Sequence, residues 1–359
     1  MLQAALKAGV DIRVNSGVKS FIVDNGAVKG VVIEKDGRDW RIGARSGVLV
    51  NAGGFSQNQE MRDKYAPGTS SRWTAAGPGD TGEMIQLMMA LGAAIGQMNE
   101  RVGNQMSIPP GRENTSGNGV ELGSVNGQMN IAKPHSLVVD QTGVRYLNEA
   151  GSYMGFCQNQ LKRNETHPAV PSWWIVDQQY MNKYMYGGTM PGTTKPQDWY
   201  SSGFLKRADT IEELAQKCGL DPATLKATVD RFNDGARAGR DDDFKRGARA
   251  YDEWLGDHYH HPSNTLGTVE QAPFYAAEVV PGDVGTYGGV VTDVYARVLR
   301  EDGTPIEGLY ATGTSTASVM GRIYPGAGSS IGPSFVFGYV AAKHAAGAHN
   351  YAGAAAAAE

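Results

Sequence analysis

The carboxy-terminal stretch from Gly308 to Tyr339 constrains this chain of 359 residues more than any other segment. It reads GLYATGTSTASVMGRIYPGAGSSIGPSFVFGY, which predicts a strand end, a loop of small residues, a Tyr-Pro-Gly turn and then a buried helix. Ala311-Thr312-Gly313 ends the strand with small side chains, so a ligand can approach the backbone there. The helix begins near Ser330, with Pro333 in its first turn, and its amino terminus offers free N–H groups and about half a positive charge. The stretch therefore predicts a place where a cofactor docks.

Composition argues against several classes of protein. The formal net charge is −4, from 33 basic and 37 acidic residues, and gives no reason to expect a nucleic-acid partner. Cys157 and Cys218 are too few for a disulfide framework, so we expect a reducing, cytoplasmic location. No apolar run approaches the ~18 residues of a membrane span, and the start does not resemble a secretory signal. The 48 glycines occur in short clusters, which indicates tight turns and close backbone approach to a ligand.

The first 55 residues predict alternating helix and strand. We expect a helix at 1–8, strands at 11–14 and 19–24, and a hairpin of 28–35 with 39–44 around Asp36-Gly37. A continuous apolar run at 47–51 predicts a strand buried on both faces of a parallel sheet. It ends in Ala52-Gly53-Gly54-Phe55, where small residues again allow a ligand close to the backbone. A helix capped by Asp80 is expected from about Thr81 to Leu91.

The middle of the chain has a different character. Strands are expected at 136–140 and 173–177, and a helix pair at 210–233, with Thr210 and Asp221 as amino-terminal caps. Near Gly288 the first pattern returns, with strands at 290–293 and 298–300 and a turn at Asp302-Gly303. The predicted fold class is therefore α/β with an α+β cap. A nucleotide-binding domain (1–112 and 286–359) is interrupted by a substrate or cap domain (113–285).

Gly77-Pro78-Gly79-Asp80-Thr81-Gly82 matches the spacing of a dinucleotide-binding turn, but its context does not fit. That motif needs a hydrophobic strand before it, and Arg72-Trp73-Thr74-Ala75-Ala76 is not one. The segment is better interpreted as a helix start that faces a cofactor, and a purely structural loop is the alternative.

Several segments resemble a known enzyme family. Gly285-Thr286-Tyr287-Gly288-Gly289-Val290, followed by Gly308-Leu309-Tyr310-Ala311-Thr312-Gly313, resembles the end of fumarate reductase and succinate dehydrogenase flavoproteins. Within that superfamily, the residues from Ser315 to Gly321 and Tyr324-Pro325-Gly326-Ala327-Gly328 are similar to the 3-ketosteroid 1-dehydrogenase branch. Arg145-Tyr146-x-Asn148-Glu149-x-x-x-Tyr153 is similar to the same branch. The resemblance runs from Ala5 to Ala345.

The resemblance implies an FAD-dependent oxidoreductase that introduces a C1–C2 double bond into 3-ketosteroids. Its fold would be an incomplete Rossmann-like FAD-binding domain with an inserted cap. Its substrate would be an apolar, steroid-like ketone, and its electron acceptor stays unknown. The cofactor-binding residues that we expect are Ala52, Gly53, Gly54, Asp80, Gly313, Thr314, Ser329, Ser330 and Ile331.

Tyr324 is the main candidate for catalysis. Desaturation next to a ketone requires a polarised carbonyl, and a phenol O–H together with a backbone N–H can act as its oxyanion hole. Tyr324 and the Gly328 N–H are four residues apart across a turn and can converge on one oxygen. In the resembled family these positions hold the C3 carbonyl. The alternative is a buried aromatic residue beside a turn.

The base that removes the proton should be a second tyrosine. The pKa of a free tyrosine is about 10, so this base needs a lowered pKa, which a neighbouring tyrosine or a polar network could supply. The family's base follows its Asn-Glu segment, which implies Tyr153. Tyr184 is the competing candidate, and a core role for Tyr153 is the third possibility.

Two rival functions stay open at this point. Arg322 could bind a carboxylate in a fumarate-reductase-like reductase of an unsaturated acid, although Thr286-Tyr287 stands where those enzymes have a histidine. We also expect the family's glycine-rich turn and ribose-binding acid to precede Met1, in roughly 150 residues. An inactive fragment, or a subunit that needs another chain to complete its FAD site, is therefore the second rival. His258, His260 and His261 lack the spacing of a metal site, so no metal is expected.

Overall fold

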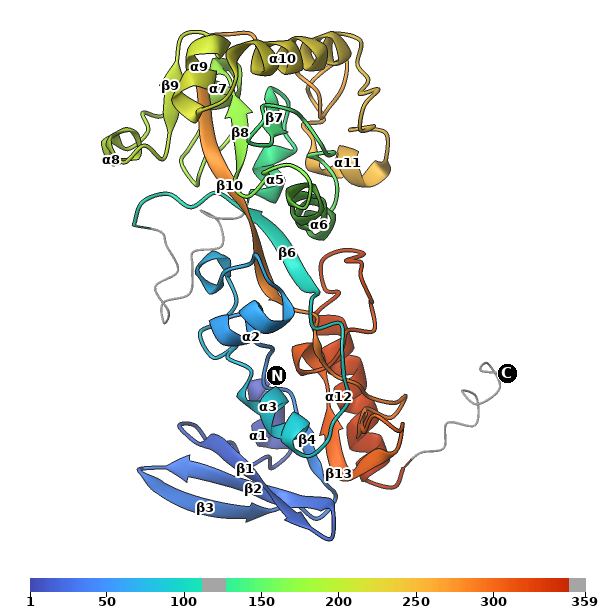
Figure 1. Cartoon of the computed structure of the whole chain (residues 1–359). Helices are drawn as coiled ribbons and strands as arrows, with labels where there is room; N and C mark the ends of the chain where they lie inside the picture. The colour runs from blue at the N-terminus through green and yellow to red at the C-terminus, as the bar shows by residue number, and fades with distance from the viewer. Residues whose placement is uncertain (112–126, 349–359) are drawn as a thin grey trace.

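The structure is a computed structural model that describes residues 1–111 and 127–348. Among these residues the longest strand is β10 (Phe274–Thr286), which runs through the middle of an elongated molecule (Figure 1). Its first half pairs antiparallel with β8 (Ser172–Val176) and β9 (Lys206–Ala208), and its second half with β6 (Arg101–Met106). One continuous strand therefore connects the two ends of the molecule.

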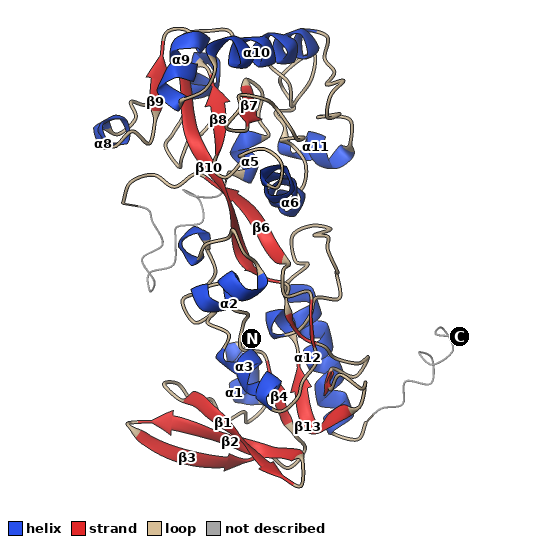
Figure 2. Ribbon diagram, in the orientation of Figure 1, coloured by secondary structure: helices blue, strands red, loops and turns tan. Residues whose placement is uncertain are grey.

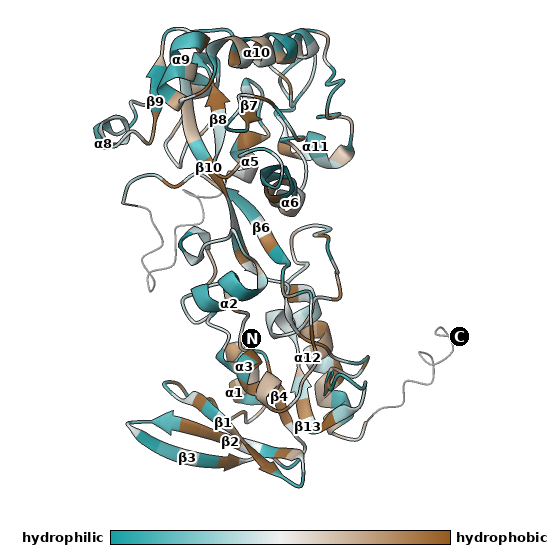
Figure 3. Cartoon of the chain, viewed as in Figure 1, coloured by the Kyte–Doolittle hydropathy of each residue, from teal (hydrophilic) through white to brown (hydrophobic). Residues whose placement is uncertain are grey.

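The upper end in Figure 1 is a mixed layer of sheet and helices. β7 (Ser136–Val139) pairs with β8, and both strands are buried at every residue, which agrees with their brown colour in Figure 3. The helices around this sheet are α5 (Gln128–Ile131), α6 (Tyr153–Asn164), α7 (Gln178–Lys183), α8 (Gln197–Ser201), α9 (Ile211–Cys218), α10 (Pro222–Arg237) and α11 (Ala250–Leu255).

The predicted helix pair is confirmed. The Thr210 hydroxyl accepts the N–H of Glu213 at the start of α9, and the Asp221 carboxylate accepts the N–H of Thr224 at the start of α10. Each cap satisfies an N–H group that has no partner inside the helix. The apolar sides of both helices then cover the sheet, where Leu214 and Leu225 are fully buried.

A buried ion network holds this end together. Arg145 donates to both carboxylate oxygens of Glu149 (2.9 and 2.8 Å) and pairs with Asp241 (3.0 Å). Arg246, also buried, lies 3.2 Å from Glu149. Burial would raise the pKa of Glu149, but Arg145 and Arg246 outweigh it and lower that pKa. The Arg145-to-Glu149 segment is therefore a structural anchor for the helix that follows it.

Among the described residues the lower end contains two three-stranded sheets and a short two-stranded one (Figure 2). β1 (Gly17–Asp24), β2 (Ala27–Lys35) and β3 (Arg38–Gly43) form an antiparallel meander, which confirms the Asp36-Gly37 hairpin. In the second sheet β4 (Val48–Val50) runs parallel to β13 (Pro305–Ala311), and β12 (Arg297–Leu299) is antiparallel to it. The remaining elements here are α1 (Leu2–Lys7), α2 (Gln59–Tyr65), η1 (Ser71–Trp73), α3 (Glu83–Ala90), β5 (Ile95–Gly96), β11 (Gly289–Val290), η2 (Gly313–Ser315) and α12 (Ile331–Ala345).

Three expectations for this end are wrong. Residues 11–14 form no strand, because no neighbouring strand pairs with them within the described chain. Leu49 of β4 is 42% exposed, so that strand is not covered on both faces by the described residues. Helix α12 is not buried either. Only Ala341 is buried along it, and its large exposed side chains are Ile331, Phe335, Val336 and Tyr339.

The predicted boundary at residues 112 and 113 lies outside the described residues, so the division into two domains stays a prediction. In the described part of the chain, no helix combines the length and the apolar composition that a membrane crossing requires.

Candidate functional site

The ends of β4 and β13 and the start of α12 surround a cavity of about 450 Å³. Parallel strands bring their carboxyl ends to the same edge of a sheet, and ligands of α/β folds bind at that edge. Seven of the nine predicted cofactor residues line the cavity: Ala52, Gly53, Asp80, Gly313, Thr314, Ser330 and Ile331. Eight further lining residues were not among the nine: Asn51, Ala76, Gly77, Gly79, Val102, Val284, Gly285 and Ser334.

The turn after β4 is held rigidly by groups that are distant in sequence. Asp80 accepts the backbone N–H groups of Gly54 and Ser56, and the Ser315 hydroxyl donates to the Gly53 carbonyl (2.8 Å). A Cβ atom on Gly54 would overlap the Thr286 hydroxyl, so only glycine fits there. Gly54 is buried behind the cavity wall, and we interpret it as a supporting residue.

Asp80 does not cap helix α3, so that part of its predicted role is wrong. Helix α3 begins at Glu83, and its cap is Gly82 in a left-handed conformation, without a side-chain hydrogen bond. The Asp80 carboxylate is engaged with the turn after β4 and cannot cap the helix. Gly77 and Gly79 line the cavity, which agrees with the interpretation that this segment faces a ligand.

The start of α12 lines the same cavity through Ser330 and Ile331. Ser330 precedes the helix and makes no side-chain capping bond, so the amino-terminal N–H groups are not capped by a side chain. Ser329 instead bonds the Gly326 carbonyl (2.6 Å) and lines a smaller neighbouring cavity of about 20 Å³. The helix start is therefore suited to an electron-rich ligand, and Ser329 supports the loop before it.

Three tyrosines meet beside this cavity. The rings of Tyr153 and Tyr324 lie 4.8 Å apart between centroids at 51°, and Tyr287 stacks on Tyr324 at 6.2 Å and 23°. Val102 and Val284 pack against these tyrosines and also line the cavity, so the two valines separate the tyrosine cluster from the cavity. The structure thus brings the predicted Tyr153 and Tyr324 together next to the predicted cofactor site.

Each tyrosine comes from a different element. Ser152 caps α6 by accepting the Gly155 N–H (3.2 Å), which places Tyr153 at the first helical position. Tyr287 follows β10, and Tyr324 lies in the loop before α12. Gly328, in the same loop, has φ +98°, and no group among the described residues accepts its N–H. That N–H is free to bind a substrate oxygen.

The expectation of a lowered pKa for Tyr153 is wrong in this structure. Burial and the neighbouring Tyr324 hydroxyl raise the pKa of Tyr153 well above that of a free tyrosine. Burial raises the pKa of Tyr287 to about 12, and Tyr324 contributes to that shift as well. The Tyr153 phenol keeps its proton because no cation among the described residues contributes to its pKa shift.

The competing base, Tyr184, is in another part of the molecule. Its ring packs against Tyr180 in the upper core, and its hydroxyl donates to Asp257 (2.7 Å). It belongs to a different buried cluster from Tyr324. The geometry therefore favours Tyr153 over Tyr184.

Arg322 is not arranged to bind a carboxylate substrate. Its side chain is 74% exposed, and its Nε pairs with Glu100 at 2.7 Å. It lines a groove that shares no residue with the cavity at the end of β4. Among the described residues no group of three His, Cys, Asp or Glu side chains is arranged to hold a metal ion, and His260 instead packs against the ring of His135.

Comparison with known proteins identifies the family. The sequence pattern of the FAD binding domain matches residues 1–331. The chain belongs to the FAD binding domain family. Its cofactor is FAD, which fits the cavity of small residues and the uncapped start of α12. This result confirms the predicted fold class and cofactor.

Individual relatives agree with the resemblance. The chain is 39% identical over 352 residues to the 3-oxosteroid 1-dehydrogenase of Mycobacterium tuberculosis, covering 95% of this chain and 60% of that protein. It is 36% identical over 354 residues to the 4-oxocyclohex-2-ene-1-carboxylate 5-dehydrogenase of Sinomonas cyclohexanicum, covering 96% and 58%. The crystal structure of 3-ketosteroid delta1-dehydrogenase from Sterolibacterium denitrificans in complex with 1,4-androstadiene-3,17-dione superimposes with a TM-score of 0.89. It is 36% identical and covers 97% of this chain and 62% of that one. The chain thus spans about 60% of the length of these relatives.

Sequence reasoning missed two parts of this site. Val102 and Val284 form its shared wall, and nothing in their local sequence distinguishes them from core residues. Tyr287 was part of the segment that carries the resemblance and stands where related enzymes have a histidine, but it was not named as a site residue, and its position was the available signal.

Proposed function

We propose that this chain carries the substrate site of a flavin-dependent 3-ketosteroid 1-dehydrogenase. The observation that carries the proposal is the contact of Tyr153 with Tyr324 beside the FAD cavity. The walls around these tyrosines are aliphatic and aromatic, with Val102, Met154 and Val284 among them. Such a surface suits an apolar ring system with one ketone.

In this proposal each residue acts on a defined atom of the substrate. The Tyr324 hydroxyl and the Gly328 N–H donate to the C3 oxygen, which makes the protons on C2 more acidic. Tyr153 takes a proton from C2. FAD held in the neighbouring cavity would supply the acceptor for the hydride from C1. The electron pair of the C2–H bond then forms the C1–C2 double bond.

The raised pKa of Tyr153 sets a condition on this role. A protonated phenol cannot accept the C2 proton, so only the small phenolate fraction is active near neutral pH. The rate should therefore increase with pH. We also propose a cytoplasmic location, which is supported by Cys157 and Cys218 as buried free thiols.

The rival carboxylate substrates, including unsaturated acids, need a cation near the tyrosines. Arg322 pairs with Glu100, and Arg101 lies 3.7 Å from the buried Asp283. Both cations therefore already have a carboxylate partner. This arrangement favours a neutral ketone over an acid.

The test is to load the chain with FAD and measure turnover. Retained flavin is read from its visible absorbance, and androstenedione is then added with an artificial electron acceptor. The expected product is the 1,4-diene, identified by mass spectrometry. A protein that retains FAD but reduces fumarate and leaves androstenedione unchanged would overturn the proposal. If the chain does not retain FAD, the same assay is run on a chimera in which it replaces the matching part of the Mycobacterium tuberculosis relative. A chimera that retains FAD but does not convert the steroid would also count against the proposal.

A further inference from the structure

Something must fix the spacing of the three tyrosines, because they come from three separate segments. Tyr153 is on α6, Tyr287 follows β10, and Tyr324 lies in a loop with little regular structure. Proton removal and carbonyl binding both depend on the separation of Tyr153 and Tyr324, and an error of about 1 Å in such a site can cost about 100-fold in rate.

Glu100, just before β6, contacts all three segments. Its Oε1 pairs with Arg322 Nε at 2.7 Å, and Arg322 lies two residues before Tyr324. Its Oε2 accepts from Gln158 Nε2 of α6 at 3.0 Å. Its backbone carbonyl accepts the N–H of Tyr287 at 2.9 Å.

The same side chains also bond to each other. Gln158 Nε2 donates to the Arg322 carbonyl at 3.0 Å, in addition to the Glu100 carboxylate. Glu100, Gln158 and Arg322 therefore form a closed group of contacts, which we call the Glu100 clasp. It joins α6, which carries Tyr153, directly to the loop that carries Tyr324.

The clasp is the main polar attachment of that loop near Tyr324. Further upstream, the Ser318 N–H donates to the Tyr287 carbonyl (3.0 Å), and Gln97 donates to the Ser318 carbonyl (2.9 Å). From Gly321 to Gly326, two residues make polar contacts with other described segments. One is Arg322, and the other is Tyr324 through its hydroxyl. Without the clasp, Tyr324 would be held by ring packing and by the contact of its own hydroxyl with Tyr153.

The burial of Glu100 makes the clasp sensitive to the relative position of the Tyr324 loop and α6. The Glu100 side chain is only 6% exposed, and a buried carboxylate is costly unless it is paired and hydrogen-bonded. Each of its oxygens has one partner, so a shift of either the loop or α6 would leave an oxygen unsatisfied. The arrangement is therefore stable at one relative position of the two segments.

The clasp does not touch the cofactor cavity. Its three side chains line a groove of about 820 Å³ on the other side of β6, where Arg101 and Gly103 also face, whereas Val102 faces the cavity. This follows from the alternation of side chains along a strand. Glu100 can thus affect the reaction only through the tyrosines.

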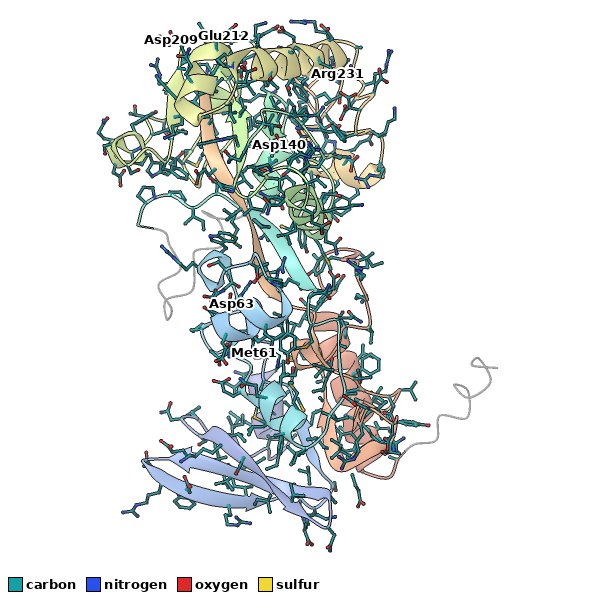
Figure 4. All side chains as sticks on the ribbon, in the orientation of Figure 1. Met61, Asp63, Asp140, Asp209, Glu212 and Arg231 are labelled. Atoms are coloured by element: carbon teal, nitrogen blue, oxygen red, sulfur yellow. The ribbon has the colours of Figure 1, made fainter. Side chains whose placement is uncertain are left out.

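The far end of α6 is anchored independently. Arg163 Nε donates to the Asp140 carboxylate at 2.8 Å, just beyond β7 (Asp140 is labelled in Figure 4). Loss of the clasp would therefore remove a polar link near the end of α6 that carries Tyr153, where the buried Met154 and Cys157 still pack, while the Arg163 link stays in place.

We propose that Glu100 is a positioning residue that sets the separation of Tyr153 and Tyr324. The inference of a catalytic effect rests on the proposed function, whereas the positioning itself does not. The variants that test it are Glu100→Gln, Arg322→Gln and Gln158→Leu. Arg322→Gln is important because it removes the ion-pair partner of Glu100 from an exposed position, and thermal unfolding shows whether the variant is folded. Glu165→Gln is the matched control, because this exposed carboxylate lines the same groove and follows the same helix.

The primary measurement is the ¹⁹F spectrum of 3-fluorotyrosine placed at position 324. We expect the signal to shift or broaden in Glu100→Gln and Arg322→Gln and to stay unchanged in Glu165→Gln. Combining Glu100→Gln with Gln158→Leu should add little further change, since residues of one network have non-additive effects. In the FAD-loaded protein, kcat should fall about 10- to 100-fold with KM nearly constant.

The outcomes separate the two proposals. An unchanged ¹⁹F signal in Glu100→Gln and Arg322→Gln, with thermal unfolding showing that both are folded, would overturn the clasp. The same shift in Glu165→Gln would overturn it as well. A shift in the clasp variants without steroid turnover by any FAD-loaded form would support the clasp and refute the proposed reaction.

Discussion

Replacing Tyr324 with phenylalanine removes one oxygen atom from the candidate site and nothing else. The Tyr324 ring is 8% exposed and packs against Tyr153 and Tyr287, so Phe keeps these contacts. The lost hydroxyl is the proposed donor to the substrate ketone. We therefore expect a large loss of catalysis without a comparable loss of stability.

The magnitude follows from the burial of the site. Removing one oxyanion-hole donor from a site that excludes water costs about 100- to 1,000-fold in kcat, or roughly 3 to 4 kcal/mol. Water is disfavoured as a replacement for the hydroxyl, because Tyr324 belongs to an apolar cluster with Val102, Met154 and Val284. The Gly328 N–H would keep part of the stabilisation, so we expect the lower end of the range.

The assay is the reduction of bound FAD under anaerobic conditions after mixing with saturating androstenedione. Tyr184→Phe is the matched control, since it removes the same atom from another buried tyrosine. That variant loses the bond to Asp257 and should be less stable by about 1 to 3 kcal/mol, with FAD reduction unchanged. A Tyr324→Phe protein that reduces FAD within threefold of the original rate, or a Tyr184→Phe protein that is equally slow, would refute the reasoning.

Three further predictions concern charge and pH. Because burial and Tyr324 raise the pKa of Tyr153, kcat/KM for the steroid should keep rising above about pH 9. Tyr153→Phe should remove both this rise and most of the activity. A plateau of kcat/KM near neutral pH would contradict the prediction. Asp283→Asn breaks a fully buried ion pair with Arg62 (2.7 Å) and should lower the free energy of unfolding by about 3 to 5 kcal/mol. Urea unfolding measures this change, and a loss below about 1 kcal/mol would show that the pair is dispensable. Burial would raise the pKa of Asp257, but Lys183 outweighs burial and holds that pKa below its usual value. The stability that ionised Asp257 contributes is therefore present above about pH 4 and is lost as the pH falls further. Thermal unfolding of Asp257→Asn should therefore differ from that of the unchanged chain at pH 7 and converge with it in acid, and a constant difference would contradict the sign.

Local signals in the sequence predicted the elements that local bonds define. Thr210 and Asp221 cap their helices within three residues, and Asp36-Gly37 closes a two-residue hairpin turn. The start of α3 was wrong for the opposite reason. Asp80 has the right chemistry for a cap, but it bonds to the backbone of Gly54 and Ser56, more than twenty residues earlier. A competing distant partner of this kind cannot be read from a short window.

The site shows the same limit. Tyr324 and Gly328 belong to one turn, so their spacing and their resemblance to a known family were enough to select them. Tyr153 was identified by the same resemblance, and its contact with Tyr324 is now visible. The pKa of Tyr153 was expected to fall, but it rises, because the neighbours are phenols and apolar groups and no cation is among the causes of its shift. How a neighbouring side chain shifts the pKa of Tyr153 depends on the position and charge of that side chain, and the sequence alone does not give its position.

The position of Val102 explains why cofactor binding and proton removal should respond differently to mutation. Val102 lies in both the wall of the FAD cavity and the tyrosine cluster, whereas its neighbours Arg101 and Gly103 face the opposite groove. The cavity is built mostly from the ends of β4 and β13 and the start of α12, which all belong to the lower end of the molecule. The tyrosines instead need α6 from the upper end, held against the lower loop by Glu100. A change in the clasp should therefore leave the FAD cavity intact and misplace the proton acceptor, while a change at Val102 should disturb both together.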